Sequence, residues 1–290
     1  MPDGPRLTAV VVNYNARDHL LGCLRSLRDD GVEAIVVVDN ASSDGSTAAV
    51  LEADPAVVVI PTGGNLGFGA AANRGLAAAR GEYAVVLNPD VLVEPGTMKV
   101  LADAADRDAA LAALGPRVEN LDGTLYPSAR TFPDLLDSAG HAFLGFVMPE
   151  NRFSRRYRML DWDHASARTV DWVSGTCVLL RLSALGAVGG FDEGYFMYVE
   201  DVDLCWRLGR AGWRVGYEPQ GRVVHTIGAS SERAPYRMIL AHHRSLLRFS
   251  AKTATGPRRL LLPLVGVGLA VRTVLAWLQR ARRGRPHAAL

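Results

Sequence analysis

The chain has 290 residues, of which 49% are hydrophobic, so it can bury the core of one large domain or of one domain with an appendage. Its three cysteines, Cys23, Cys177 and Cys205, lie far apart and form no CxxC pair. This spacing argues against a zinc site or a disulfide framework and fits a reducing compartment. An apolar run begins at Leu7 with no basic and apolar leader before it, so we expect no secretory signal.

The formal net charge of +2 conceals an asymmetry between the body and the end of the chain. No Asp or Glu follows Glu232, so residues 1–232 carry all 30 acidic residues against 20 Lys and Arg, a net −10. Residues 233–290 carry 12 Lys and Arg, a net +12. A basic tail on an acidic body suggests an anionic partner for the tail: a membrane surface, nucleic acid or phosphorylated lipid.

Short apolar runs rich in valine predict buried parallel strands in the first ninety residues. They are Leu7–Val12, Ala34–Val38, Val57–Ile60 and Tyr83–Leu87. The segments between them have helical spacing or are rich in alanine, and predict helices over Asp18–Leu27, Thr47–Glu52 and Ala70–Ala79. This alternation predicts a parallel, doubly wound sheet, in which ligands bind beyond the carboxyl ends of the strands. Asp39 and Asp90 both lie at such ends.

The second half of the chain has weaker signals. Residues 115–130 are typical of a loop with a turn at Asp122-Gly123, and the basic residues 149–170 predict a mobile loop. A strand is predicted over Val173–Leu180, a helix over Val202–Arg210 and a short strand over Val223–His225.

Three carboxylates, Glu200, Asp201 and Asp203, end the aromatic and apolar stretch 190–204. Placing adjacent acids on an apolar segment costs desolvation and mutual repulsion, which raises at least one pKa. Carboxyl groups with a raised pKa serve as general bases, so the cluster suggests a catalytic site. A helix N-terminus, where acids are favoured by the macrodipole, is an alternative that the local sequence supports equally.

The segment Leu260–Leu278 has nineteen residues and Arg272 as its only charge. As a helix it would be about 28 Å long, close to the roughly 30 Å of a hydrocarbon core. An arginine near mid-membrane costs about 2.5–3.5 kcal/mol, and basic residues on both sides give no orientation signal. We therefore expect a monotopic or re-entrant helix in the cytoplasmic leaflet, with a helix docked on the body as the alternative.

Five motifs occur in a fixed order along the chain. They are Val-Val-Asn-Tyr-Asn at 11–15, Val-Asp-Asn-Ala-Ser-Ser-Asp-Gly-Ser at 38–46, Gly-Asn-Leu-Gly-Phe-Gly-Ala-Ala-Ala-Asn-Arg-Gly at 64–75, Leu-Asn-Pro-Asp-Val at 87–91 and Glu-Asp-Val-Asp-Leu-Cys-Trp-Arg at 200–207. In this order and spacing, from Val10 to about Lys252, the chain resembles glycosyltransferase family 2, the inverting enzymes of the GT-A fold. A Rossmann dehydrogenase needs a glycine triplet after the first strand, which residues 13–17 lack.

The resemblance implies an α/β fold of the GT-A type, with a Rossmann-like, mostly parallel central sheet flanked by helices and a C-terminal basic and hydrophobic helical tail. We expect residues 1–232 to form the glycosyltransferase domain, with a nucleotide-binding half over about 1–115 and an acceptor half over about 116–232. Residues 233–290 would then form a basic helical region that associates with the membrane.

The resemblance also implies a set of donor-binding side chains. Asp39 would accept a hydrogen bond from the pyrimidine N3–H of the nucleotide, with a turn-forming aspartate as the alternative. The loop at 65–69 would lie beside the nucleotide, where glycine permits close approach and a helix N-terminus favours phosphate; an ordinary capped helix is the alternative. The nucleotide-sugar residues implied are Asn13, Asp39, Asn65, Gly67, Asn73, Asn88 and Asp90.

Asn88-Pro89-Asp90 occupies the place of the Asp-x-Asp motif of the family. Asp90 would bind Mg²⁺ or Mn²⁺ bridging the donor diphosphate, because hard oxygen ligands and substrate phosphates suit these ions. Asn88 removes one negative charge, so the metal would bind weakly until the donor arrives. His225 would be a further metal ligand, with a core or capping histidine as the alternative.

The resemblance assigns the general base to Asp201, which would take the proton of the acceptor hydroxyl, with Glu200 as the alternative base. Asp203 and Glu200 could instead orient the neighbouring helix. The acceptor side is implied for Trp172, Ser174, Gly175 and Arg244. The indole of Trp172 could stack on a sugar or pack in the core. Arg244, with Arg237 and Arg248, would face acceptor phosphates or, as we favour, anionic lipid headgroups.

Residues 115–133 and the use of Asn-Pro-Asp look like the rhamnosyltransferase branch of the family. That branch implies a nucleotide-sugar donor, dTDP-rhamnose, and a polyprenyl-diphosphate-linked GlcNAc acceptor in cell-wall or polysaccharide assembly. The chain would then work at the cytoplasmic face of the cell membrane, as a peripheral or monotopic protein on an anionic surface. Another donor, or a nucleotide-sugar-binding protein without catalysis, is the alternative. Nucleic-acid binding is disfavoured, because the basic residues bracket an apolar run rather than aromatic stacking positions.

Overall fold

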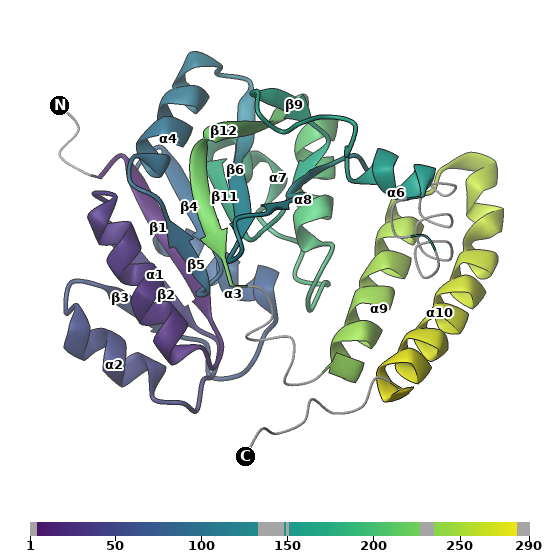
Figure 1. The fold of residues 1–290 in the computed structure, drawn as a ribbon, viewed down its shortest axis with the longest axis horizontal. Helices are drawn as coiled ribbons and strands as arrows, with labels where there is room; N and C mark the ends of the chain where they lie inside the picture. Colours follow the sequence, from purple (N-terminus) through teal and green to yellow (C-terminus); the bar gives the residue numbers. More distant parts are fainter. Residues whose placement is uncertain (1–4, 133–147, 149–150, 227–234, 283–290) are drawn as a thin grey trace.

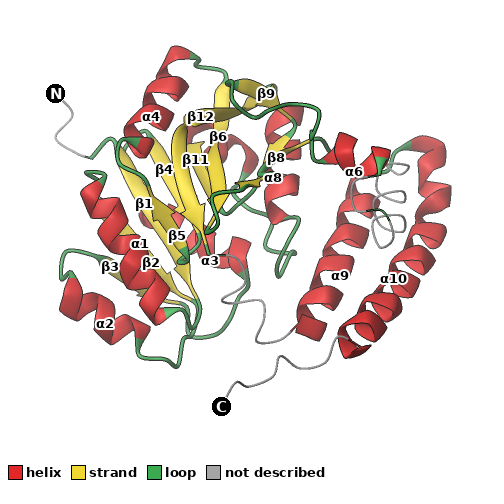
Figure 2. Ribbon diagram, viewed as in Figure 1, coloured by secondary structure: helices red, strands yellow, loops and turns green. Residues whose placement is uncertain are grey.

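The computed structural model describes residues 5–132, 148, 151–226 and 235–282. In this part of the chain a central mixed sheet is covered by helices on both faces (Figures 1 and 2). Its main path runs β3–β2–β1–β4–β11–β6–β12–β5, with β7 and β9 paired at the side. The strands are β1 Leu7–Asn13, β2 Ala34–Asp39, β3 Val58–Pro61, β4 Tyr83–Leu87, β5 Val91–Val93, β6 Leu111–Asn120, β7 Leu125–Tyr126, β9 Arg168–Val170, β11 Cys177–Arg181 and β12 Arg214–His225. A small second sheet pairs β8 (Ala129–Arg130) with β10 (Trp172–Val173).

The four predicted N-terminal strands are present and pair in parallel in the order β3–β2–β1–β4. Their side chains alternate between two cores. Ala9 and Val11 of β1 enter the core on one face, and Val10 and Val12 enter the core on the other. β1, β2 and β4 are buried on both faces, and such strands read as continuous valine runs, which is why the sequence predicted them. The prediction of a buried strand was wrong for β3, because it lies at the edge of the sheet and Val58 is 53% exposed.

Helices from both halves of the chain cover these two cores. One face packs against α1 (Arg17–Asp29), α2 (Ser46–Ala53) and α4 (Thr97–Arg107). The other packs against α3 (Phe68–Ala78), α7 (Leu182–Val188) and α8 (Glu200–Arg210). The fold is therefore the mixed α/β, GT-A arrangement that the sequence predicted, with the central sheet between two layers of helices.

Three predictions for the second half were wrong. Residues 115–130 are not a loop: they contain most of β6, together with β7 and β8. Residues 149–170 contain a short helix, α6 (Arg152–Tyr157), and β9. The predicted strand 173–180 is divided into β10 and β11, because residues 174–176 leave the sheet.

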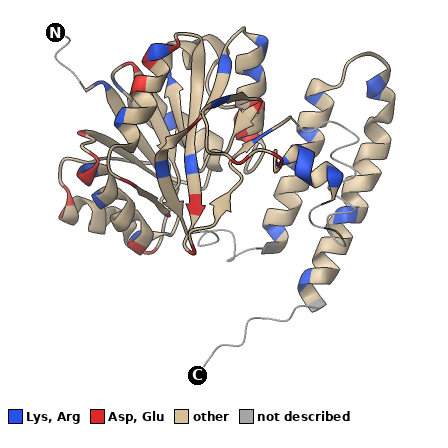
Figure 3. Ribbon diagram, turned by 45° about the horizontal axis from the view of Figure 1, so that its top comes forward, with Lys and Arg blue, Asp and Glu red and all other residues tan. Residues whose placement is uncertain are grey.

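The C-terminal part forms two long helices that run side by side (Figure 1). They are α9 (Pro235–Thr253) and α10 (Leu262–Arg282), joined by a 3-10 turn, η1 (Gly256–Leu261). The predicted C-terminal helix is thus present. Lys and Arg, and no Asp or Glu, mark the described residues of α9 and α10 (Figure 3). Residues 256–281 are long and apolar enough to cross a membrane, with a mean hydropathy of 1.9 and 6% of the apolar window buried.

Candidate active site

Asp39 ends β2 at the carboxyl edge of the sheet, opposite Asn13 at the end of β1. The fully buried Asn13 amide donates to an Asp39 carboxylate oxygen (3.2 Å) and to the Ser42 hydroxyl (3.0 Å). The other Asp39 oxygen accepts from the Ser42 N–H (3.1 Å), so the turn-forming role of Asp39 is observed. The Asn13 side chain therefore holds the Asp39 carboxylate in place through a hydrogen bond. Recognition of a nucleotide by Asp39 stays a prediction that this turn leaves possible.

Asn40, which the sequence analysis did not single out, holds the adjacent loop. Its amide is 3% exposed and donates to the Asn65 side chain (3.1 Å), and its oxygen accepts from the Leu66 N–H (2.9 Å). The Thr62 hydroxyl also bonds to the Asp39 carbonyl. Asn40 therefore ties the 62–67 loop to the end of β2. The sequence feature that could have singled out Asn40 is its position directly after Asp39.

Gly67 is needed for a contact between protein segments. Its φ of +86° lies in the left-handed region, and a Cβ there would stand 2.0 Å from the carbonyl oxygen of Phe196. The next N–H, that of Phe68, donates to the same Phe196 oxygen (3.0 Å). The glycine-rich loop thus lies against the loop that leads into α8. The close approach that the sequence predicted toward a nucleotide is made here toward Phe196.

Asn73, which was predicted to bind the nucleotide-sugar donor, lies within α3. Its side chain bonds to the loop that leads into α8. Its amide nitrogen donates to the Phe191 carbonyl (2.9 Å), and its oxygen accepts from the Phe191 N–H (2.9 Å). The nitrogen also reaches the Glu193 carboxylate (3.1 Å). The Asn73 side chain therefore fixes the start of the 190–199 loop.

Asp90 and His225 meet at the same edge of the sheet. The Nε2 atom of His225 lies 3.1 Å from an Asp90 carboxylate oxygen, and both side chains are largely buried. The register of β12 against β5 places His225 opposite Val91, next to Asp90. An open pocket of about 350 Å³ adjoins His225 and is lined by Asn120, Leu121, Asp122 and His225. The sequence predicted each residue at a strand end, and the structure brings the two together.

A divalent cation shared by this pair would bind the Asp90 carboxylate and the Nε2 atom of His225, which lie 3.1 Å apart, and a ligand would supply the remaining donors. The Nδ1 atom of His225, on the side of the ring away from Asp90, is buried without a hydrogen-bond partner and would not take part. Among the described residues no group of three or more His, Cys, Asp or Glu is arranged to hold a metal. A carboxylate and an imidazole therefore need phosphate and water oxygens to complete a coordination shell. Asn88, with a neutral amide, adds no charge to the pair.

Glu200 and Asp201 form the first turn of α8 and differ in their surroundings. Glu200 is 6% exposed, and its Oε2 atom is buried without a partner. Burial, together with the neighbouring Asp201, raises the pKa of Glu200 well above its ordinary value. Asp201 is half-buried and accepts from the N–H groups of Gly175 (2.9 Å) and Val202 (2.8 Å).

Burial also raises the pKa of Asp201, but the two N–H groups and the charge of Arg130 oppose this rise. The two adjacent acids therefore have different partners, and the donors and the Arg130 charge favour the negative charge on Asp201 rather than on Glu200. The geometry therefore favours Asp201 over Glu200 as the base.

The backbone just before this pair is in an uncommon conformation. Tyr198 and Val199 have φ values of +64° and +69°. Val199 is β-branched, so the left-handed conformation costs on the order of 1–3 kcal/mol and persists only where the surroundings enforce it. The packing around the start of α8 therefore holds this backbone in place.

Three of the residues predicted at the acceptor side lie next to Asp201, in the ribbon formed by β8 and β10 and in the turn that follows β10. Gly175 donates its N–H to Asp201, and the Ser174 hydroxyl bonds to Thr176 (2.9 Å). Trp172 is 4% exposed, and its indole N–H donates to the Thr131 carbonyl (2.9 Å). Its ring packs in the core, so stacking on a sugar, the other interpretation of Trp172, does not fit its burial.

Arg130 is a cation in this ribbon that the sequence analysis left without a role. Its guanidinium lies over the rings of Trp172 (5.1 Å), Tyr126 (5.6 Å) and Tyr157 (5.6 Å). It donates to the Pro127 carbonyl and the Tyr126 hydroxyl. Three aromatic faces and two neutral oxygens stabilise a positive charge beside Asp201.

The arginines of α9 do not share one environment. Arg244 and Arg237 are exposed. Arg248 is also exposed, and one terminal nitrogen of its guanidinium pairs with Asp192 in the loop before α8 (2.9 and 3.1 Å). That Arg248 faces phosphate or lipid stays a prediction, and the structure adds that a carboxylate of the body fixes one edge of its guanidinium.

Comparison with known proteins identifies the family. The family model described as "Glycosyl transferase family 2" matches residues 8–186, and one described as "Glycosyl transferase family group 2" matches residues 147–283. The chain belongs to glycosyl transferase family 2. It is a glycosyltransferase, as the motifs predicted.

Two curated family 2 relatives match along most of their length. The N-acetylglucosaminyl-diphospho-decaprenol L-rhamnosyltransferase of Mycobacterium tuberculosis is 42% identical over 264 residues, covering 86% of this chain and 85% of the relative. Rhamnosyltransferase WbbL of Escherichia coli K12 is 28% identical, covering 84% of this chain and 92% of the relative.

Solved glycosyltransferase structures share the fold at low sequence identity. A mannosyltransferase from Pyrobaculum calidifontis, in complex with GDP-Man and Mn²⁺, matches with a TM-score of 0.62 and 19% identity, over 98% of this chain and 77% of that chain. TarS 1-349 of S. aureus matches with a TM-score of 0.56 and 16% identity, over 92% of this chain and 71% of that chain. These likenesses confirm the predicted GT-A fold.

The acid pair generates a pH prediction for this glycosyltransferase. A base must be ionised to act, so kcat/KM is lost as pH falls through the raised pKa of Asp201. We expect the acid limb above the ordinary carboxyl value of about 3.9. Because the Arg130 charge lowers the pKa of Asp201, Arg130→Gln should move this limb to higher pH and Arg130→Lys should largely restore it. An acid limb at the same pH in the wild type and in both variants would contradict the influence of the Arg130 charge on the pKa of Asp201.

Gly67→Ala and Gly63→Ala form a matched pair. Both glycines have positive φ, but a Cβ at Gly63 meets nothing within 4 Å, whereas at Gly67 it meets the Phe196 carbonyl. We expect Gly67→Ala to destabilise the protein by about 1–3 kcal/mol more than Gly63→Ala and to lower turnover, because the 190–199 loop must shift. Thermal unfolding and initial rates measure both effects. Equal unfolding temperatures of the two variants would show that the Phe196 carbonyl does not restrict the side chain at position 67.

Proposed function

We propose that this enzyme transfers L-rhamnose from dTDP-rhamnose to a hydroxyl group of N-acetylglucosaminyl-diphospho-polyprenol. The observation that carries the proposal is the likeness to the mycobacterial rhamnosyltransferase, which extends over 86% of this chain and 85% of that enzyme. The second rhamnosyltransferase supports the donor sugar. The product class is a lipid-linked disaccharide for cell-wall or polysaccharide assembly.

Asp201 is the general base of the proposed reaction. It accepts the proton of the acceptor hydroxyl while that oxygen bonds to the anomeric carbon and the nucleoside diphosphate departs. The N–H groups of Gly175 and Val202 hold the carboxylate, and each leaves a lone pair on its oxygen. Burial and the neighbouring Asp201 raise the pKa of Glu200, which disfavours a second negative charge beside the base.

Asp90 and His225 are the residues that would hold a divalent cation, Mg²⁺ or Mn²⁺. When bound, such a cation neutralises the diphosphate that accumulates charge as the leaving group. Mn²⁺ in the mannosyltransferase structure supports a divalent ion in this fold. Asp39, Asn40 and the 62–67 loop form the donor side at the same edge of the sheet. Asn13 would hold the Asp39 carboxylate in place through its hydrogen bond.

The exposed apolar stripe of α10 supports a place at the cytoplasmic membrane surface. The stripe has helical spacing and consists of Leu264, Val267, Val271, Val274 and Leu278, which are 47–68% exposed. Arg272 does not lie in it, because its guanidinium bonds to His243 of α9 (3.0 Å). Burial and the Arg272 charge lower the pKa of His243 to about 4, so the histidine stays neutral and accepts this bond.

The α10 helix has one apolar face, and its Arg272 side chain bonds to α9. This arrangement favours a helix that lies in the plane of the membrane interface over one that crosses the membrane. The basic residues of η1, Arg258 and Arg259, are exposed beside the stripe and would meet anionic headgroups. A lipid-linked acceptor requires the enzyme at this surface.

Donor turnover tests the proposed reaction. Purified enzyme with Mg²⁺ or Mn²⁺ should release nucleoside diphosphate from dTDP-rhamnose, among dTDP-, UDP- and GDP-sugars, when a short-chain GlcNAc-diphospho-lipid is present. Asp201→Asn should lower kcat by about 10²–10⁴-fold and leave donor binding unchanged, as measured by calorimetry. Release from another donor would exclude the rhamnosyl assignment, and wild-type turnover by Asp201→Asn would exclude Asp201 as the base.

Vesicle flotation tests the membrane surface. Leu264→Glu/Val267→Glu introduces two charges into the α10 stripe, and Leu51→Glu/Val58→Glu introduces two at exposed apolar positions of the body. We expect the first variant to lose binding to phosphatidylglycerol vesicles and to keep its rate with a water-soluble acceptor, and the second to bind normally. Equal flotation of both variants would contradict docking through α10.

A further inference from the structure

One face of α9 lies against the loop that leads into α8. Ser245, Arg248 and Lys252 are three and four residues apart, so they share a side of the helix. Ser245 donates its hydroxyl to the Met197 carbonyl (2.9 Å). Arg248 donates to both carboxylate oxygens of Asp192 (2.9 and 3.1 Å), and Lys252 donates to one of them (2.8 Å). The contacts therefore follow the loop from its start to the residues just before the acid pair.

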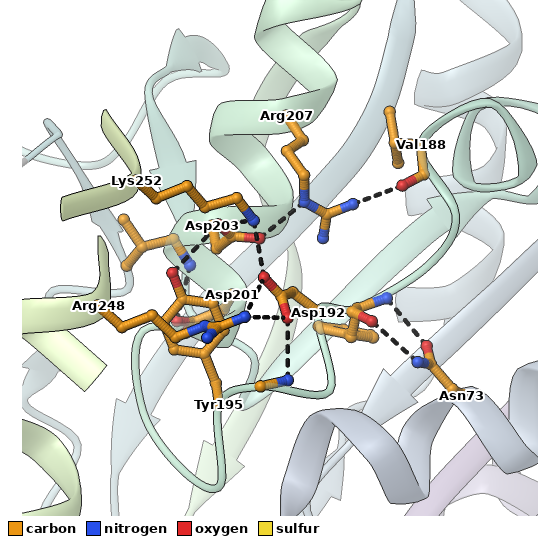
Figure 4. A network of polar contacts seen from close by, with 12 residues as sticks. Asn73, Val188, Asp192, Tyr195, Asp201, Asp203, Arg207, Arg248 and Lys252 are labelled. Carbon is orange, nitrogen blue, oxygen red and sulfur yellow. Dashed lines mark hydrogen bonds and ion pairs between the residues drawn. The ribbon is translucent and has the colours of Figure 1, made fainter. Parts of the chain in front are cut away.

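Lys252 also reaches α8 itself. Its ammonium lies 2.7 Å from the carboxylate of Asp203, which is fully buried. The same carboxylate accepts from the Tyr195 hydroxyl (3.2 Å) and from Arg207 (2.7 Å). Figure 4 shows Lys252 between the two acids, with Asp192 on one side and Asp203 on the other. Lys252 is thus the cation that joins the loop to the helix.

The packing around this network leaves little freedom. A Cβ on Gly194 would stand 2.1 Å from the Arg248 guanidinium, which lies 5.2 Å from the centre of the Tyr195 ring. Lys252 lies 6.0 Å from the same ring. Arg248 and Lys252, two of the cations of α9, therefore both lie close to the Tyr195 ring, whose hydroxyl bonds to Asp203.

Asp203 connects this network to Asp201. The Asp203 N–H donates to the Val199 carbonyl (2.8 Å), which closes the first turn of α8 around Asp201. Val199 and Tyr198 hold the uncommon left-handed conformation at this point. Loss of Lys252 would leave the buried Asp203 carboxylate with Arg207 as its one cation among the described residues, and it would leave Asp192 held by Arg248 without a link to α8.

We propose that Lys252 is a positioning residue for the base: through Asp203 and Asp192 it fixes the first turn of α8, and with it the carboxylate of Asp201. This inference rests on the proposed role of Asp201 in sugar transfer. It makes α9 part of the catalytic unit, whereas the apolar stripe that faces lipid belongs to α10.

Full-length Lys252→Met tests the inference against Lys252→Arg and Lys99→Met. Lys99 is the other lysine of the chain and is 77% exposed in a pair with Asp103. We expect Lys252→Met to lower kcat by about 10–100-fold, as a small misplacement of a reacting group does, with KM for the donor changed less than about 2-fold. Lys252→Arg should recover most of kcat, and Lys99→Met should match the wild type. The acid limb of the kcat profile should shift in Lys252→Met alone.

Wild-type kcat in a folded Lys252→Met would overturn the proposal, and so would an equal loss in Lys99→Met. If Lys252→Met does not fold by circular dichroism, Ser245→Ala removes one bond from the same face and should lower kcat several-fold; an unchanged kcat there would also overturn it. Asp201→Asn, measured in parallel, separates the two claims. Full turnover by Asp201→Asn removes the base assignment itself, whereas an inactive Asp201→Asn with normal Lys252→Met removes the role of Lys252 alone.

Discussion

The first turn of α8 is the constraint on which the site depends. It begins after two residues in the left-handed conformation and carries an acid pair in which only Asp201 is well supplied with donors. Three segments hold this turn in place. Gly67 and Phe68 of the glycine-rich loop contact Phe196, Gly175 bonds to Asp201, and Lys252 of α9 pairs with Asp203. The glycine-rich loop, the acid pair and α9 are therefore parts of one packed unit.

The parts of the fold that were predictable from the sequence are those that local composition determines. Valine runs identified β1, β2 and β4, because strands buried on both faces leave a continuous apolar signal. The strand β6 was missed because Gly115 and Pro116 suggested a loop. Gly115 is required in that strand by packing, since a Cβ there would stand 2.8 Å from Val173. Such a requirement depends on a partner nearly sixty residues away and is not visible in the local sequence.

The same distinction holds for the site. Asp90 and His225 were predicted individually from strand ends, and their 3.1 Å contact follows from the register of β12 against β5. Asn73 and Gly67 were placed at the nucleotide by motif, but their contacts are with Phe191 and Phe196, about 120 residues later. The basic tail was predicted to face an anionic partner. Within it, Arg248 and Lys252 pair with acids of the body, and the exposed apolar stripe begins after η1.

The central claim is that a single base, Asp201, promotes direct displacement at the anomeric carbon. The most direct test is the configuration of the new glycosidic bond, determined by nuclear magnetic resonance on the product of a short-chain acceptor. One displacement promoted by one base predicts a product whose anomeric configuration is inverted relative to the donor. Retention would require a second nucleophile and a covalent intermediate, and it would contradict the account.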